Sequence, residues 1–226
     1  MDKFNTFLKE SEHRRHYFNN FSTMRRKTER KKRYHHGNLA ESLLDAVDEL
    51  ASQFGLEAVT LRGCAKLTGV SPSSAFRHYT DKRALLTAFA ARALEELSDL
   101  MSSASHRAKL EGGNPFLAVG LTYIEFALDK PAFFRAMWHE EAIYSSDPDY
   151  LDAASKLALH LKSGFAQSIK DDDKSDYSAQ ELLAWSSVHG LANLFIDGPV
   201  ARDKTRSEKM EIASDMLKTM GPALMI

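Results

Sequence analysis

The segment from Thr60 to Lys82 predicts two short helices joined by a tight turn, and it constrains the fold more than any other part of the sequence. Thr60 is expected to cap the first helix, because its hydroxyl can accept a hydrogen bond from a free N–H of the first turn. Gly69 can adopt the positive φ angle at which such a helix ends. Ser71 is expected to cap the second helix, and Pro72 suits its first position, where no N–H is needed. This turn chemistry indicates a helix-turn-helix, a motif whose second helix enters the major groove of DNA.

Charged residues are distributed unevenly along the chain. Residues 1–36 carry a net charge of +7, whereas the remainder carries −8, so the total of −1 hides the asymmetry. A basic arm on an acidic body fits an anionic partner that is contacted at one end. Such an arm could follow the phosphate backbone or enter a minor groove. A solvated charged tail is the alternative interpretation of the same composition.

The composition excludes several other classes of protein. The single cysteine, Cys64, rules out an internal disulfide and a cysteine-rich zinc site, and we interpret it as a small core residue rather than a redox switch. The histidines lack acidic or cysteine partners at metal-ligand spacing, so we predict no metal and no cofactor. No apolar run approaches the roughly 18 residues of a membrane span, and no signal peptide is recognisable. We therefore expect a cytoplasmic protein with no membrane partner.

Apolar residues recur at helical spacing along most of the chain, and no alternating strand pattern appears, so we predict an all-α fold. We expect three parts: a basic, disordered arm over 1–37, a DNA-binding domain over 38–100 and a second helical domain over 114–226. The loop between the two domains is expected within Ser102–Pro115, where Gly-Gly-Asn-Pro marks a break. The helix predicted over 178–196 is apolar on nearly all sides, which is typical of a core helix or a subunit contact.

The helix-turn-helix resembles the DNA-binding domain of the tetracycline-repressor (TetR) family. The resemblance covers roughly Asn38 to Leu100 and rests on the pattern T-L-R-x-x-A-x-x-x-G-V-S-x-x-x-x-F-R-H-Y-x-x-K-x-x-L-L. An ordinary αα-turn is the alternative, but Arg77, His78 and Lys82 make little sense as core residues. The resemblance implies a three-helix DNA-binding domain followed by a helical domain that dimerises and binds a small molecule.

The residues expected to contact DNA lie on the two helices of the motif or at their ends. They are Thr60, Arg62, Ser73, Ser74, Phe76, Arg77, His78 and Lys82. Arg77 can bond two acceptors of a guanine at once, which is the commonest way of reading a base. Ser73 and Ser74 lie nearest the base edges but discriminate weakly, while His78 and Lys82 are expected at the phosphates. Phe76 replaces the tyrosine that is usual in the family, and it cannot bond a phosphate.

The second half of the chain resembles one TetR subgroup with a W-x-x-x-H-G signature, here Trp185, His189 and Gly190. The upstream run F-A-L-D-K-P-A-F-F-R-A-M fits the same subgroup. The resemblance implies a homodimer built from the last two long helices and a ligand pocket, but it does not name the effector. The expected pocket residues are aromatic, soft or polar side chains: Tyr123, Phe126, Met137, Trp138, Trp185 and His189. Plain core packing is the alternative for each of them.

The sequence therefore predicts a dimeric regulator that binds double-stranded operator DNA and responds to a small-molecule effector, most often as a repressor in this family. Two other functions are weighed against it. A constitutive dimeric DNA-binding protein would have a C-terminal core with no accessible cavity. An interaction module that has lost DNA binding is disfavoured by the polar, basic second helix of the motif. An enzyme is not expected, because the chain has no phosphate-binding glycine loop, no G-x-S-x-G and no H-E-x-x-H.

Overall fold

The structure is a computed structural model, and it describes residues 38–164 and 177–224. Every regular element in these ranges is a helix, which confirms the all-α prediction. The residues from Leu39 onward form one compact unit. The expected basic arm over 1–37 lies outside the described residues. No helix within the described ranges is long and apolar enough to cross a membrane.

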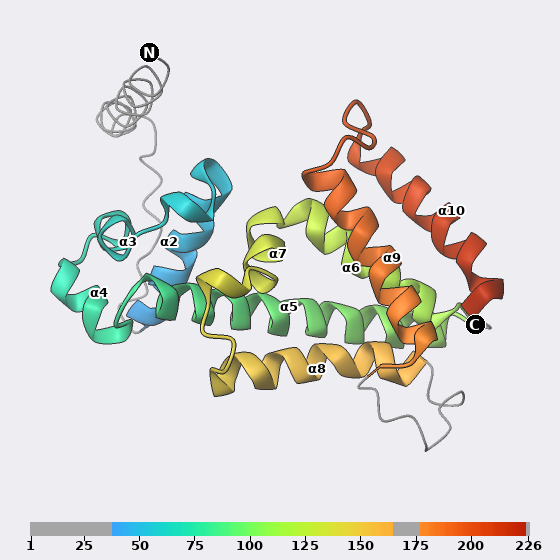
Figure 1. Cartoon of the computed structure of the whole chain (residues 1–226), viewed down its shortest axis with the longest axis horizontal. Coiled ribbons are helices and arrows are strands. Elements are labelled where there is room, and N and C mark those ends of the chain that lie inside the picture. The colour runs from blue at the N-terminus through green and yellow to red at the C-terminus, as the bar shows by residue number, and fades with distance from the viewer. Residues whose placement is uncertain (1–37, 165–176, 225–226) are drawn as a thin grey trace, which may run out of the picture. The chain divides into compact units, whose positions relative to one another are not determined.

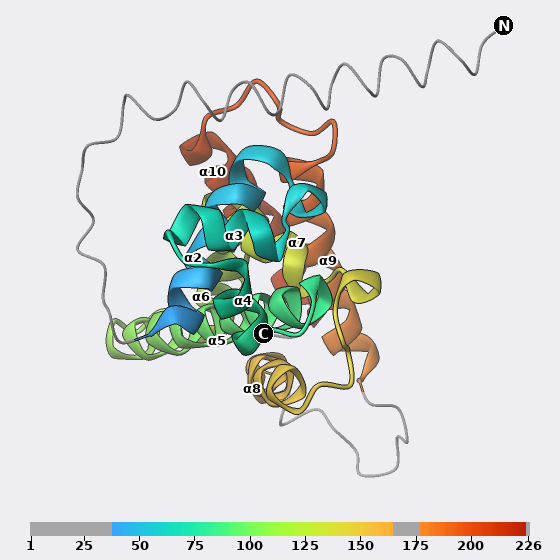
Figure 2. The ribbon, with the colours of Figure 1, turned by 90° about the vertical axis from the view of Figure 1, so that its left-hand side faces the viewer.

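The N-terminal part of this unit consists of four short helical elements that precede one long helix (Figures 1 and 2). They are α2 (Leu39–Phe54), the single 3₁₀ turn η2 (Leu56–Ala58), α3 (Leu61–Thr68) and α4 (Pro72–His78). In Figure 2, α2, α3 and α4 face the viewer. Helix α2 packs against both α3 and α4, so the two helices of the motif share one support.

The turn chemistry of the motif is as predicted. The Thr60 hydroxyl accepts a hydrogen bond from the Gly63 N–H at 3.0 Å, and the Ser71 hydroxyl accepts one from the Ser74 N–H at 3.2 Å. Gly69 ends α3 with φ of 74°, in the left-handed region where a side chain is disfavoured. Each helix of the motif therefore begins and ends at the residue that its local chemistry specifies.

Helix α5 (Lys82–Leu110) connects the motif to the rest of the protein. Asp81 caps it by accepting the Ala84 N–H at 2.8 Å. We expected a boundary from Ser102 to Pro115 with a loop at the Gly-Gly-Asn-Pro cluster; α5 continues through the first part of this segment to Leu110, and the chain leaves the helix just before the two glycines. Buried Ala104, beside a run of good helix formers, extends the helix until the glycine pair is reached.

The C-terminal helices pack around α5 on two sides (Figure 1). They are α6 (Pro115–Asp129), α7 (Pro131–Met137), the 3₁₀ turn η3 (Glu140–Ala142), α8 (Pro148–Gly164), α9 (Ala179–Ile196) and α10 (Arg206–Leu224). Helix α8 runs beside α5, while α6 contacts α5, α9 and α10. This arrangement places α6 at the centre of the C-terminal helices.

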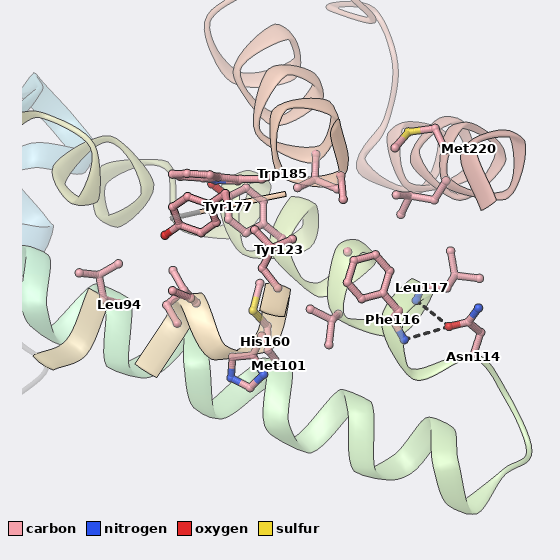
Figure 3. Close-up of a pocket in the computed structure, with 18 of the residues that line it drawn as sticks. Leu94, Met101, Asn114, Phe116, Leu117, Tyr123, His160, Tyr177, Trp185 and Met220 are labelled. Atoms are coloured by element: carbon pink, nitrogen blue, oxygen red, sulfur yellow. Dashed lines mark hydrogen bonds between the residues drawn. The ribbon is translucent and has the colours of Figure 1, made fainter. Parts of the chain in front are cut away.

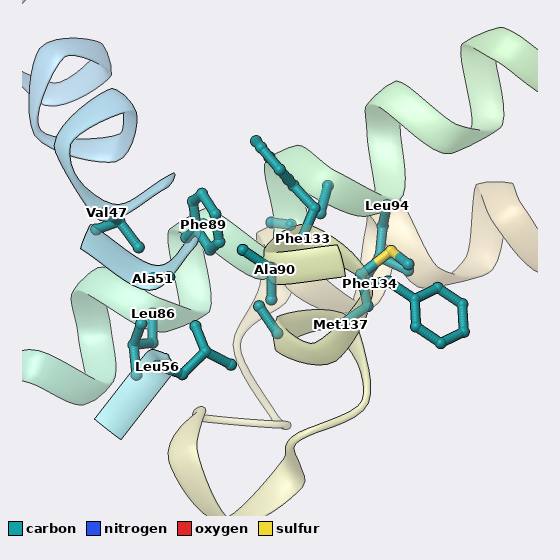
Figure 4. Packing of buried hydrophobic residues seen from close by; sticks show 14 of the residues in the cluster. Val47, Ala51, Leu56, Leu86, Phe89, Ala90, Leu94, Phe133, Phe134 and Met137 are labelled. Atoms are coloured by element: carbon teal, nitrogen blue, oxygen red, sulfur yellow. The ribbon is translucent and has the colours of Figure 1, made fainter. Parts of the chain in front are cut away.

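A continuous apolar core joins α2, α5 and α7 (Figure 4). The rings of Phe89 on α5 and Phe133 on α7 lie 4.4 Å apart between centroids, and Val47 of α2 belongs to the same core. Cys64 is fully buried, and burial raises the pKa of its thiol to about 11. The structure thus supports the interpretation of Cys64 as a core residue, since reactivity requires the thiolate.

Candidate functional site

The exposed face of the helix-turn-helix is polar, basic and free of acidic side chains. Neither α3 nor α4 contains an aspartate or glutamate. Arg62 on α3 is exposed, as are Arg77 and His78 on α4. Phe76, the one large apolar side chain of α4, is 44% exposed. An exposed surface with this chemistry suits the phosphates, sugars and thymine methyl groups of a DNA groove.

A cluster of hydroxyl groups orders the first turn of α4. The Ser71 Oγ lies 2.9 Å from the Oγ atoms of both Ser73 and Ser74. The Arg77 Nη2 donates to the Ser74 Oγ at 3.2 Å. The guanidinium is therefore held against half-buried Ser74 rather than extending freely into solvent, and four of its five N–H groups remain outside this bond.

Lys82 has a structural contact that the sequence did not suggest. Its Nζ donates to the carbonyl oxygen of Glu57 at 2.9 Å, which ties η2 to the first turn of α5. The side chain is half-buried. Because an ammonium has three donors, two remain for a phosphate. Thr60 is likewise engaged within the motif, since its hydroxyl caps α3.

A cavity of about 510 Å³ lies among the C-terminal helices (Figure 3). Helices α5, α6, α8, α9 and α10 all contribute described residues to its wall. Three of the expected pocket residues line it: Tyr123 from α6, Trp138 from the end of α7 and Trp185 from α9. Trp138 and Trp185 are the only tryptophans in the chain, and their rings lie 5.4 Å apart.

The other three expected pocket residues do not line the cavity. Phe126 is 3% exposed and packs edge-to-face on Phe133, and Met137 is fully buried in the core. His189 lies behind the wall, where its Nδ1 is 2.8 Å from the hydroxyl of Tyr123. His189 therefore contacts Tyr123 of the wall and is not itself part of the wall.

Sequence reasoning missed most of the apolar wall. The missed residues come from all five helices of the wall, and they include Leu94, Met101, Tyr150, Leu157, Leu217 and Met220. An apolar residue at helical spacing looks the same whether it faces a neighbouring side chain or a cavity. Tyr150 and His160 each place a polar group on an otherwise apolar face and so offered a signal; the Tyr150 hydroxyl donates to the Met137 carbonyl at 3.0 Å.

Burial favours the neutral form of two histidines, one in the cavity wall and one behind it. Burial lowers the pKa of His189 and of His160, which lines the cavity and lies 3.0 Å from the Ser98 hydroxyl. Among the described residues that line the cavity there is no aspartate or glutamate, and the one charged side chain is Lys218. The wall therefore carries little charge at neutral pH.

Comparison with known proteins assigns both halves of the chain. Residues 43–89 match the family of bacterial regulatory proteins described as the tetR family. Residues 116–218 match the tetracyclin repressor-like C-terminal domain. The first match contains the helix-turn-helix, and the second contains α6 to α9, which supply much of the cavity wall. The chain belongs to the TetR family. TetR-family proteins are DNA-binding transcriptional regulators, and dimerisation and ligand binding are typical of them.

Individual relatives agree with this assignment. YobS of Bacillus subtilis (strain 168), an uncharacterized HTH-type transcriptional regulator, is 29% identical over 100 residues, which are 44% of this chain and 51% of YobS. The alignment thus spans about half the length of that relative. A protein with unknown function from Rhodococcus sp. RHA1 is 25% identical with a TM-score of 0.64, covering 82% of this chain and 96% of that one. A TetR family transcription regulator from Marinobacter aquaeolei VT8 shares the fold at 19% identity and a TM-score of 0.55, covering 78% and 92%.

The proteins of the TetR family are transcription regulators rather than enzymes. Within residues 38–164 and 177–224, no three His, Cys, Asp or Glu side chains gather in the way that a metal site requires.

Proposed function

We propose that the protein is a transcriptional repressor that binds operator DNA as a homodimer and is released when a small molecule enters the cavity. The observation that carries this proposal is the cavity of about 510 Å³ with a largely aromatic and aliphatic wall. Small-molecule sites usually measure about 300–1,000 Å³ and have this composition. The alternative, a constitutive DNA-binding protein whose C-terminal domain only dimerises, predicts a core without such a space.

One segment connects the cavity wall to the DNA-binding motif. We call residues 138–150 the coupling segment, since its two ends, Trp138 and Tyr150, both line the cavity. Between them, the carbonyl of Ile143 accepts a hydrogen bond from Arg83 Nε at 2.6 Å, and the Arg83 guanidinium lies 4.6 Å from the Tyr144 ring centroid. Arg83 belongs to the first turn of α5, directly after α4. A ligand that displaced either end of the segment would therefore act on the helix that follows the groove-reading helix.

Two further hydrogen bonds attach the coupling segment to α5. The Tyr144 N–H donates to the Thr87 Oγ1 at 2.8 Å, and the Tyr144 hydroxyl donates to the Asp81 Oδ2 at 2.8 Å. Asp81 is also the cap of α5. The backbone bond at its cap and the bond from Tyr144 lower the pKa of this carboxyl. The segment thus holds both the cap and the second turn of α5.

We expect Thr87→Val to release the coupling segment without unfolding the protein. Valine keeps the shape of threonine but cannot accept the Tyr144 N–H, and leaving such a group unpaired costs about 1–3 kcal/mol. Amide exchange at Tyr144 should accelerate about tenfold or more. Hydrogen-exchange mass spectrometry of the full chain measures this directly.

Thr122→Val is the matched control, because the Thr122 hydroxyl bonds only to the Ala118 carbonyl of its own helix, at 2.9 Å. It should leave exchange at Tyr144 unchanged. Equal exchange in the Thr87 and Thr122 variants would show that the Thr87 contact does not hold the segment.

We assign base reading to Arg77 and phosphate binding to Lys82. Arg77 is exposed and oriented over the serines of α4, whereas Lys82 is anchored at the junction of η2 and α5. Two such α4 helices must lie about 34–36 Å apart to read two half-sites. His78, Arg62 and Phe76 complete the surface through phosphate, sugar or methyl contacts.

Replacing each of the two basic residues is expected to have a different signature. Arg77→Ala should lower operator affinity by about 1–3 kcal/mol and relax the preference at one base pair of each half-site. Lys82→Ala should weaken operator and scrambled DNA alike and reduce the salt slope by about one. Titrations of both DNAs at several salt concentrations separate these outcomes, with exposed Lys109→Ala at the far end of α5 as control. Equal losses on both DNAs for Arg77→Ala would transfer the base-reading role to Ser73 and Ser74.

The proposed function as a whole is tested by selecting genomic fragments that the full chain binds, followed by screening small molecules for release. An enriched, palindromic sequence and a releasing compound are the expected results. Ala158 lines the cavity, so Ala158→Phe should retain operator affinity and lose release. A protein that enriches no sequence is not a regulator of this kind. One that binds an operator but is released by nothing fits the constitutive alternative.

A further inference from the structure

We infer that the cavity takes a linear aliphatic monocarboxylate, with its hydrocarbon chain along the inner side of α8 and its carboxylate at the open end of the cavity beside Lys218. The inference rests on the proposed function, because it names the chemical class of the effector. It concerns binding to the free protein, however, and does not depend on how binding is transmitted to DNA.

The first observation is that the cavity is long and narrow. Along α8 its wall extends from Tyr150 to Leu161, which is about 16 Å of helix at the usual rise per residue. In Figure 3 the wall extends from Leu94 at one end to Asn114 and Met220 at the other. A volume of about 510 Å³ over this length corresponds to a mean cross-section of about 30 Å². This shape suits one extended chain better than a broad fused-ring system.

The second observation is that one end of the cavity is closed and apolar. Helices α5 and α8 run side by side in the same direction (Figure 1), so Leu94 of α5 and Tyr150 of α8 lie toward the same end of the wall. Their side chains are buried, at 1% and 9% exposure. The Tyr150 hydroxyl is already bonded to the Met137 carbonyl, so this end presents an apolar surface to the tip of a hydrocarbon chain.

The polar groups of the inner wall bond one another. The Tyr123 hydroxyl is hydrogen-bonded to the indoles of Trp138 and Trp185, and burial raises its pKa. The same hydroxyl lies 2.8 Å from the Nδ1 atom of His189. Polar groups that are paired in this way need no partner from a ligand. The inner wall therefore favours an apolar occupant.

The third observation is that the other end of the cavity is open. Asn114 and Lys218 are the two exposed side chains among the described residues of the wall. Asn114 caps α6, and Lys218 belongs to the last two turns of α10, which packs against α6. In Figure 3, Met220, two residues after Lys218, lies at the same end of the wall as Asn114. A polar head group can remain in contact with water at this end while the chain is buried.

The exposed groups at the open end are hydrogen-bond donors. The Asn114 Oδ1 accepts the N–H groups of Phe116 and Leu117 at 2.9 and 3.1 Å, so the amide offers its NH₂ group for further bonds. Lys218 lies 3.8 Å from Asp215, but this pair is exposed and contributes little. No aspartate or glutamate is among the described residues of the wall. A carboxylate at this end therefore meets a cation and donors, whereas an ammonium would meet only repulsion.

Three probes separate the effect of the chain from that of the head group: dodecanoate, hexanoate and dodecylammonium. Each is titrated into the full chain by calorimetry at neutral pH, below the concentration at which the dodecyl probes form micelles. Dodecanoate should bind about 100-fold or more tightly than hexanoate, because each buried methylene tightens binding about fourfold. It should bind about tenfold more tightly than dodecylammonium, which has the same chain and the opposite charge.

Lys218→Gln tests the position of the head group. It removes the charge at the open end, so it should abolish the preference for dodecanoate over dodecylammonium. Lys204→Gln is the matched control, because Lys204 is also an exposed lysine close to a carboxylate, that of Glu208 at 3.3 Å, but lies outside the cavity wall. This control should retain the preference.

Ala154→Leu tests the position of the chain. Ala154 lines the cavity one turn of α8 after Tyr150, so leucine shortens the space at the closed end. Dodecanoate should bind about tenfold more weakly to this variant. Hexanoate should bind as before, because a short chain with its head at the open end does not reach the substitution. Ser155→Leu on the exposed face of α8 is the matched control and should leave the binding of both probes unchanged.

Four results would overturn the inference: no binding of dodecanoate, equal binding of dodecanoate and hexanoate, tightest binding of dodecylammonium, or a Lys218→Gln variant that keeps the preference for the carboxylate. Equal losses of dodecanoate and hexanoate in Ala154→Leu would contradict the orientation of the chain. If all the expected preferences appear but no ligand ever releases operator DNA, the inference stands and the proposed function fails.

Discussion

Replacing Leu183 and Leu194 together by lysine is expected to convert the protein from a dimer to a monomer and to lower operator affinity about 100-fold or more. Both side chains lie on one stripe of α9, and they are 45% and 42% exposed. Between them, Gly190 faces open space, so a second helix can approach the backbone closely. Large exposed leucines on one helix face are typical of a subunit contact.

The expected loss of operator affinity follows from the linkage of two DNA-binding motifs in one dimer. A dimer that occupies one half-site presents its second motif at a high effective concentration, which is worth about 10²–10⁴ in affinity. A monomer loses this gain even if each contact to DNA is intact. Introduced lysines prevent the contact because two copies would bring unpaired charges together in an apolar interface.

Light scattering at micromolar concentration and operator titrations measure the two effects. Light scattering of the unmodified protein should give the mass of a dimer, about twice the 25.4 kDa of one chain. The double variant should give the mass of a monomer, 25.4 kDa. The matched control is Leu151→Lys with Leu159→Lys, which changes two exposed leucines of α8 and should remain dimeric. A double α9 variant that stays a dimer would place the interface elsewhere. If the double α9 variant were a monomer and still bound operator DNA with full affinity, the proposal that two linked motifs read the operator would be wrong.

The second large effect is expected from Phe133→Ala, which should destabilise the protein by about 3–5 kcal/mol. Phe133 is 2% exposed on α7, and its ring packs on Phe89 of α5 and Phe126 of α6. It thus closes the junction where α7 meets α5, close to the contact of α7 with α2 (Figure 4). Truncation would remove the contacts of the ring and leave a void that the surrounding helices cannot fill.

Thermal denaturation measures the loss of stability of Phe133→Ala. A drop in the melting temperature of roughly 10 °C is expected for a chain of this length. Phe76→Ala is the matched control, because it makes the same chemical change on the exposed face of α4. It should change stability by less than about 0.5 kcal/mol, the usual effect of a surface substitution, while weakening DNA binding. Similar melting of the two variants would show that the Phe133 junction does not stabilise the fold.

The helix-turn-helix could be predicted residue by residue because its determinants are local. Thr60 and Ser71 cap the helix that each precedes, and Gly69 adopts a backbone angle that few other residues tolerate. None of these choices depends on what packs against the motif. The all-α fold class was also accessible, since a period of 3.6 residues in the apolar pattern is a property of each segment alone.

The cavity was only partly predictable. Trp185 and Tyr123 were expected in the pocket because aromatic, soft and polar side chains are the usual lining of a ligand cavity, and both line the wall. Phe126 and Met137 have the same spacing and chemistry as cavity residues, yet they pack in the core. Which side of a helix faces a space rather than a neighbour depends on how the helices lie against one another, and the order of residues along one helix does not determine this.

The sequence by itself determined the helices, their caps and the position of the reading helix, because these follow from interactions within a few residues. Only the tertiary structure decided which contacts connect the cavity with the helix-turn-helix. Residues 57 and 82 are bonded to each other, and 83 and 87 are bonded to 143 and 144, across separations that no periodicity reports. It also decided which faces of α5, α6, α8, α9 and α10 line the cavity. Such contacts arise only when helices distant in the chain pack together, which is why local chemistry predicted the parts and not their connection.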